Sequence, residues 1–126
     1  MIRQGLDEGA VGFSTGLSYF PCSYADTEEL VELCRPVAER KLPYVVHLRT
    51  VFRNNPFDPA EETLEIGRRS GVPVHFSHFR TDFKNAGQVE KLIAPIDSAQ
   101  DLGLDVSLEL YPYPSGSGKM LMHLPA

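Results

Sequence analysis

The sequence has little of what marks a membrane, secreted or nucleic-acid-binding protein. No apolar run approaches the roughly 18 residues of a membrane-spanning helix, and the first ten residues lack the apolar core of a signal peptide. Cys22 and Cys34 are its two cysteines, too few for a disulfide framework, so we expect a reducing, cytoplasmic compartment. Lys and Arg number 12 against 17 Asp and Glu, and this net charge of −5 disfavours binding to nucleic acid or to an anionic membrane surface.

What the sequence does contain is a regular alternation of short apolar runs and amphipathic stretches. Runs rich in β-branched and aromatic residues, bounded by Gly or Pro, predict four buried parallel strands at residues 10–14, 43–49, 72–78 and 104–111. Helical periodicity between these runs predicts helices at residues 27–40, 59–70 and 87–102. Thr27 is the predicted N-cap of the first of these helices, and Gly71 is the predicted stop of the second.

The spacing of the predicted strands indicates a fold class. The strand ends are 33, 31 and 32 residues apart, at Ser14, His47, His78 and Leu110. Eight units of about 32 residues would make up the roughly 250 residues of a (β/α)₈ barrel. We therefore predict an α/β fold, in which a parallel (βα)₃β segment has its strands in sequential order. This segment would be about half of a TIM (β/α)₈ barrel, and residues 1–126 would form one partial domain. The alternative is a free-standing doubly wound α/β domain.

Two of the four histidines fall where such folds collect their functional groups, at the carboxyl ends of the strands. His47 and His78 end neighbouring predicted strands, so their imidazoles could reach one ion, and neutral imidazole is a common zinc ligand. The alternative is a pair of unrelated core histidines. His75 precedes His78 by three residues, so strict alternation along a strand predicts that it points into the helix layer. His123 has no partner that the sequence identifies.

Six short motifs follow one another along nearly the whole chain: GAVGFSTGLSY at 9–19, TEEL at 27–30, VHLR at 46–49, IGR at 66–68, VPVHFSH at 72–78 and YPYPSGS at 111–117. In this order and spacing they resemble the N-acyl-D-amino-acid deacylases, the D-aminoacylase branch of the amidohydrolase superfamily. The resemblance implies a zinc-dependent (β/α)₈ hydrolase that cleaves the amide bond of N-acyl-D-amino acids. It assigns approximately strands four to seven of that barrel to this chain.

The resemblance also implies roles for single residues. His47 and His78 match the zinc ligands of the fifth and sixth strands, whereas the family's cysteine ligand and its catalytic aspartate match nothing here and are expected outside this chain. The residues expected to contact a small-molecule N-acyl amino acid substrate are Tyr19, Arg80, Tyr111 and Ser117. Arg80 stands where the family commonly has a lysine, and its planar guanidinium can hold a carboxylate through two hydrogen bonds.

Two other functions stay open on the sequence alone. One is hydrolysis of a cyclic amide by a relative of the dihydroorotases and hydantoinases. The other is a non-catalytic α/β domain that binds a partner. For the isolated chain we also expect self-association, because a half-barrel leaves the edges of its first and last strands unpaired.

Overall fold

The structure, a computed structural model, describes residues 1–50, 54–113 and 115–118, so His123 lies outside the described residues. The chain forms a sheet of four parallel strands, β1 (Phe13–Gly16), β2 (Tyr44–His47), β3 (Val74–Phe76) and β4 (Val106–Leu108). The strands pair in the order β1-β2-β3-β4, which confirms the predicted sequential parallel sheet. None of the helices within the described residues combines the length and apolar character needed to cross a bilayer.

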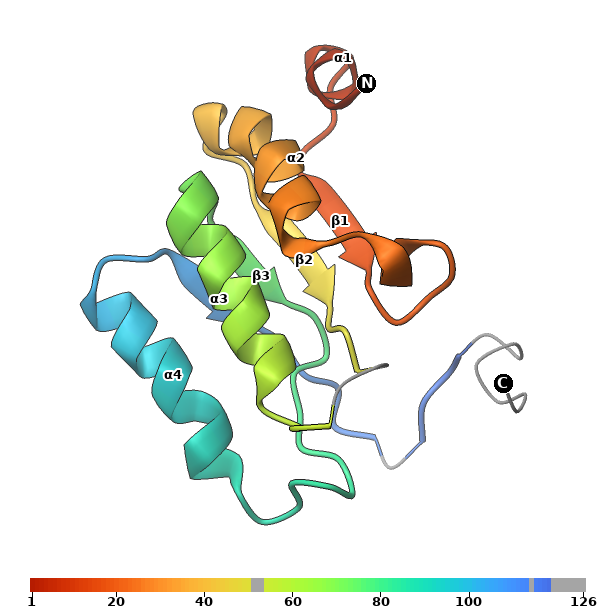
Figure 1. Cartoon of the computed structure of the whole chain (residues 1–126), viewed down its shortest axis with the longest axis vertical. Helices are drawn as coiled ribbons and strands as arrows, with labels where there is room; N and C mark the ends of the chain where they lie inside the picture. The colour runs from red at the N-terminus through yellow and green to blue at the C-terminus, as the bar shows by residue number, and fades with distance from the viewer. Residues whose placement is uncertain (51–53, 114, 119–126) are drawn as a thin grey trace.

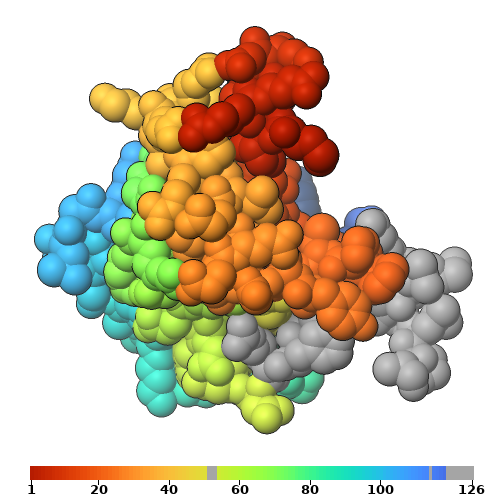
Figure 2. Space-filling model, turned by 45° about the horizontal axis from the view of Figure 1, so that its top comes forward, coloured from red at the N-terminus to blue at the C-terminus, as the bar shows by residue number. Residues whose placement is uncertain are grey.

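Three long helices lie side by side over one face of this sheet (Figure 1). They are α2 (Thr27–Glu39), α3 (Asp58–Ser70) and α4 (Val89–Asp101), and each begins and ends within two residues of its predicted bounds. The short helix α1 (Ile2–Asp7) lies against the end of α2 (Figure 2), where the side chain of Arg3 pairs with that of Glu39. A 3₁₀ turn, η1 (Cys22–Tyr24), precedes α2.

The two predicted helix boundaries have different outcomes. The N-cap of α2 is Asp26, whose carboxylate accepts the Glu29 N–H at 2.8 Å, so the prediction of Thr27 is wrong by one residue. The Thr27 hydroxyl instead donates to the Glu62 carboxylate at 3.0 Å. The prediction for α3 is confirmed: Gly71 follows it in the left-handed conformation, with φ of +75°, which a residue without a Cβ adopts at little cost.

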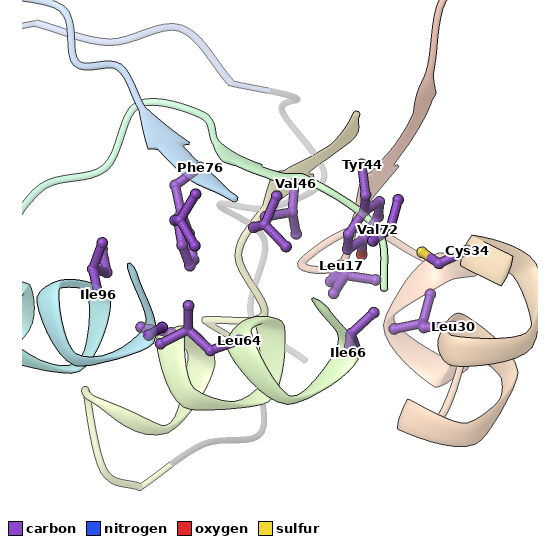
Figure 3. Packing of buried hydrophobic residues seen from close by; sticks show 14 of the residues in the cluster. Leu17, Leu30, Cys34, Tyr44, Val46, Leu64, Ile66, Val72, Phe76 and Ile96 are labelled. Carbon is purple, nitrogen blue, oxygen red and sulfur yellow. The ribbon is translucent and has the colours of Figure 1, made fainter. Parts of the chain in front are cut away.

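The hydrophobic core fills the space between the helices and the sheet (Figure 3). Alternate strand residues point into it, and the buried set includes Tyr44, Val46, Val74, Phe76 and Val106. Burying one such aliphatic or aromatic side chain stabilises a fold by about 1.5–3 kcal/mol relative to leaving it exposed. The residues between them face the other side of the sheet, where one row across the four strands is Ser14, Val45, His75 and Ser107.

The prediction that His75 points into the helix layer is wrong. Val74 and Phe76 occupy the core-facing positions of β3, so His75 lies on the opposite face, where its Nδ1 is 2.8 Å from the Ser107 hydroxyl. The error arises because β3 is shorter than predicted and ends at Phe76. His78 lies beyond the strand with a left-handed φ of +42°, and the alternation of a strand does not extend to it.

Gly67 offers a test of how tightly α3 packs on the sheet. A Cβ added to Gly67 would lie 2.7 Å from Val74 Cγ2 and 3.2 Å from Leu104. For Gly67→Ala, overpacking costs about 1–3 kcal/mol while helix propensity returns about 1 kcal/mol, so we expect a lower free energy of unfolding in urea. Gly5→Ala in α1 is the matched control: nothing lies within 4 Å of its added Cβ, and it should stabilise. Equal stabilisation by both substitutions would contradict the packing of α3 on β3.

Candidate active site

A cavity of about 970 Å³ opens at the carboxyl ends of the strands. The loop after each strand contributes to its wall: Tyr19 follows β1, Thr50 follows β2, and His78 and Arg80 follow β3. Much of the rest comes from the segment after β4, from Tyr111, Tyr113, Ser115, Gly116, Ser117 and Gly118. His47, the last residue of β2, lines it too. Parallel α/β sheets bind ligands at this end because the loops that follow the strands gather there.

Two histidines meet in this cavity. His47 Nδ1 lies 3.0 Å from His78 Nε2, and the two ring centroids are 4.7 Å apart with the planes inclined at 71°. Both side chains are half-buried. The expectation that the two imidazoles come close enough together to reach one ion is confirmed. They converge from neighbouring strands that are paired in parallel.

The geometry of the pair and the lowered pKa of His47 suit a metal ion. Two nitrogens bound to one tetrahedral zinc at 2.0–2.1 Å must lie about 3.3 Å apart, close to the separation of His47 and His78. Burial, and then the nearby charge of His78, lower the pKa of His47, which favours the neutral imidazole that coordinates metals. The two histidines therefore fit as part of a zinc site.

The remaining ligands of a zinc site are not found among residues 1–50, 54–113 and 115–118, in which no group of three His, Cys, Asp or Glu residues lies close enough together to hold a metal ion. Cys34 is buried in the core, and burial raises the pKa of its thiol to about 12, so it stays protonated. Cys22 is exposed on η1 and does not line the cavity. Neither cysteine takes the place of the ligand that the family resemblance puts outside this chain.

The four residues expected at the substrate line the same cavity as the histidines. The Tyr19 ring packs on His47 with centroids 4.8 Å apart, and the Tyr111 ring lies 6.4 Å from that of His78. The Arg80 guanidinium lies over the Tyr111 ring, 5.0 Å from its centroid. Ser117 lies on the loop after β4. These four residues and the histidine pair thus share one cavity. A substrate that bridges a metal ion and a carboxylate-binding group would require such an arrangement.

Gly16 explains how Tyr19 comes to lie on His47. The register of the sheet puts Gly16 beside His47, and a Cβ at Gly16 would lie 2.5 Å from Tyr19 Cδ2. The Tyr19 N–H donates to the Gly16 carbonyl at 3.0 Å, which closes a tight turn after β1. The tyrosine ring therefore uses the space that a side chain at Gly16 would fill.

A buried ion pair anchors the loop that carries Tyr19, and the sequence analysis missed it. Arg49 donates to the Glu62 carboxylate at 3.0 Å, and both side chains are only 7% exposed. Its other nitrogens donate to the carbonyls of Ser23 and Ala25, each at 2.7 Å. Arg49 thus joins the segment after β2 to α3 and to the loop before α2. The VHLR motif marks this arginine, but nothing in the sequence identifies its partner.

Ser18 makes a second connection that the sequence did not indicate. Its buried hydroxyl donates to the Leu48 carbonyl at 2.7 Å and accepts the Thr50 N–H at 3.0 Å. The loops after β1 and β2 are thereby joined directly above the ends of the two strands. Tyr19 and His47, each adjacent to one of these residues, are held at a fixed separation as a result.

Comparisons with known proteins agree with this geometry, although no family model matches the chain. It is 39% identical over 122 residues to an N-acyl-D-glutamate deacylase and 36% identical over 118 residues to a D-aminoacylase, both of Alcaligenes xylosoxydans xylosoxydans. Each alignment covers 93% of this chain. The chain spans 24% of the length of these curated relatives.

Solved structures of the same two kinds of enzyme also match the chain. The N-acyl-D-glutamate deacylase of Bordetella bronchiseptica, crystallised with zinc and a phosphonate mimic of the tetrahedral intermediate, superposes with a TM-score of 0.84 at 39% identity. That superposition covers 90% of this chain and 24% of the other. A D-aminoacylase structure, described as defining a subset of amidohydrolases, gives 0.79 at 38% identity, over 88% of this chain and 23% of the other.

The parallel α/β sheet of this chain thus has the fold of part of the amidohydrolases that it matches. Within that class, the chain is homologous to the N-acyl-D-amino-acid deacylases.

The Arg49–Glu62 pair generates a stability prediction. Glu62→Gln leaves the buried guanidinium without its counter-charge, and breaking a buried pair in this way costs about 3–5 kcal/mol of the free energy of unfolding. The control is Glu65→Gln on the same helix, whose carboxylate is 49% exposed and pairs with Arg68 at 3.8 Å. Exposed pairs contribute about 0–1 kcal/mol, so this variant should stay near wild type in urea unfolding. Equal losses in the two variants would show that the buried pair has no special role.

Proposed function

We propose that this chain is the central part of a zinc-dependent amidohydrolase that hydrolyses the amide bond of N-acyl-D-amino acids. The observation that carries the proposal is the 3.0 Å approach of His47 and His78 at the ends of β2 and β3. The homology to N-acyl-D-glutamate deacylase and D-aminoacylase supports it. Residues 1–126 would form one partial barrel domain and contribute approximately the fourth to seventh strands.

His47 and His78 would hold the zinc through their neutral imidazoles. The further ligand expected in the family, a cysteine from an early strand, would come from outside this chain, as would the catalytic aspartate that acts as the general base. When bound, zinc supplies Lewis-acid catalysis, polarising the scissile carbonyl and activating water. The protein's part is to orient the two imidazoles, which the packing of Tyr19 on His47 supports.

Arg80 and Ser117 would hold the carboxylate of the substrate. The guanidinium can donate two parallel hydrogen bonds to a carboxylate, and its stacking over the Tyr111 ring restricts its orientation in advance. The phenol hydroxyls of Tyr19 and Tyr111 line the same cavity and could donate to the oxyanion that develops on the carbonyl. Together these groups would align the amide bond with the histidine pair.

We further propose a cytoplasmic enzyme whose partner is its small-molecule substrate. The two cysteines and the net charge of −5 support this, since they disfavour a disulfide-stabilised exterior protein and a nucleic-acid or membrane-surface role. Cyclic-amide hydrolysis is less favoured, because all three matched curated relatives are named for open-chain N-acyl or D-amino-acid substrates.

The test is hydrolysis by the protein expressed from its complete coding sequence. N-acyl-D-amino acids should be cleaved in a zinc-dependent manner, and their L enantiomers and a hydantoin should not. His47→Ala and His78→Ala should each lower activity more than about 100-fold, since even partners outside the ligand shell are worth 10–100-fold. The control is His75→Ala, which should mainly change stability. His75 lies on the same face of the sheet as the pair, but it is hydrogen-bonded to the Ser107 hydroxyl. Preferred cleavage of the cyclic amide, or equal losses in all three variants, would contradict the proposal.

The isolated chain should self-associate. Strands β1 and β4 are both at the edge of the sheet, and the row through Ser14 and His75 has no helix over it among the described residues. Sedimentation velocity at micromolar concentration should therefore detect dimers or larger species. Leu108→Lys puts a charge on the edge strand β4 and should shift the distribution toward monomer, whereas Leu102→Lys, after α4, should not. A wild-type chain that sediments as a stable monomer would contradict this prediction.

A further inference from the structure

His78 has an unusual backbone conformation for its position. Its φ is +42°, in the left-handed region that residues with a Cβ seldom adopt and that costs conformational energy. The strand β3 ends two residues earlier, at Phe76. Such a conformation persists where surrounding contacts enforce it, so its neighbours must supply those contacts.

The left-handed turn decides which way the imidazole points. Val74 and Phe76 are buried in the core, and an extended chain would place residue 78 on the same face as these two, in the helix layer. Instead the His78 ring meets His47 on the opposite face, with 3.0 Å between their nitrogens. The histidine pair therefore exists because the chain turns at His78.

Glu109, the residue after β4, holds this turn at three points. Its N–H donates to the Phe76 carbonyl at 3.0 Å, and its carbonyl accepts the Phe79 N–H at 2.8 Å. Between these two backbone bonds, its carboxylate Oε1 accepts the His78 N–H at 2.9 Å. The backbone bonds are available to any residue at this position except proline, but the third requires a side chain that accepts a hydrogen bond at this reach.

We propose that Glu109 is a positioning residue for the histidine pair, and that its carboxylate keeps His78 turned toward His47. A hydrogen bond from an N–H to an ionised carboxylate is stronger than one between neutral groups, which suits it to a strained turn. Glu109 acts on the His78 backbone and not on the ion, and the described residues bring no third ligand to the pair. The role in metal binding rests on the proposed function; the role in turning His78 does not.

Three variants separate the hydrogen bond from the charge and from the backbone contacts. Glu109→Ala removes the acceptor, and Glu109→Gln keeps an oxygen acceptor of the same reach but removes the charge. Glu109→Asp keeps the charge but shortens the side chain by one methylene. The control is Glu90→Ala, an exposed carboxylate in the first turn of α4. If Glu109→Ala does not fold by circular dichroism, Glu109→Asp takes its place.

The first measurement needs no metal. NMR of the metal-free protein from its complete coding sequence, labelled at histidine, should give a nuclear Overhauser contact between the ring protons of His47 and His78, and slow hydrogen exchange at the His78 amide. Glu109→Ala and Glu109→Asp should lose both signals, while Glu109→Gln and Glu90→Ala should keep them. Persistence of both signals in Glu109→Ala or Glu109→Asp, or their loss in Glu109→Gln, would overturn the role of the side-chain hydrogen bond.

The second measurement is the affinity of the same variants for Zn²⁺, made in the protein expressed from its complete coding sequence and followed by competition with a chromophoric chelator. Glu109→Ala should weaken binding by about 10–100-fold, the usual effect of losing a partner that orients a ligand, with Glu109→Gln much closer to wild type. Unchanged affinity in Glu109→Ala would overturn the role in metal binding. If His47→Ala and His78→Ala leave Zn²⁺ binding unchanged, the proposed zinc site fails, and the NMR result still decides whether Glu109 turns His78.

Discussion

The buried ion pair between Arg49 and Glu62 is the interaction on which the arrangement of the site depends. An uncompensated charge in the interior would be strongly destabilising, so Arg49 has to be satisfied by partners from several elements. It takes Glu62 from α3 and the carbonyls of Ser23 and Ala25 from the loop before α2. Arg49 follows His47 by two residues. The same contacts that satisfy the charge therefore fix the loop of Tyr19 relative to the histidine pair.

Two further constraints at the ends of the strands complete the site. Gly16 leaves room for the Tyr19 ring beside His47, and the left-handed turn at His78 brings the second imidazole to the first. Each of these two constraints involves a short stretch of chain, but each affects a contact between residues of two neighbouring strands or of the loops after them. The parallel register that places Gly16 next to His47 is what allows them to work together. Apart from His47, at the end of β2, the side chains of the candidate site thus lie on loops whose positions are set by polar contacts and not by the hydrophobic core alone.

Much of the fold followed from local patterns. The periodicity of apolar residues indicated α2, α3 and α4, because each needs one apolar face toward the sheet, and Gly71 marked the end of α3. Strand order followed from the even spacing of the units. The start of α2 did not follow in the same way: Asp26 and Thr27 can both cap a helix, and in the structure Asp26 does so while the Thr27 hydroxyl donates to Glu62, 35 residues away.

The sequence by itself determined the α/β class, the sequential parallel sheet and the nomination of His47 and His78, since periodicity and position at strand ends are properties of neighbouring residues. The roles implied for Tyr19 and Arg80 came from ordered motifs. Only the tertiary structure decided that His75 and His78 share a face. This depends on where β3 ends and on Glu109, which follows β4 and lies 31 residues after His78. Long-range hydrogen bonds override the alternation of a strand, and no pattern along the chain records which partners will make them.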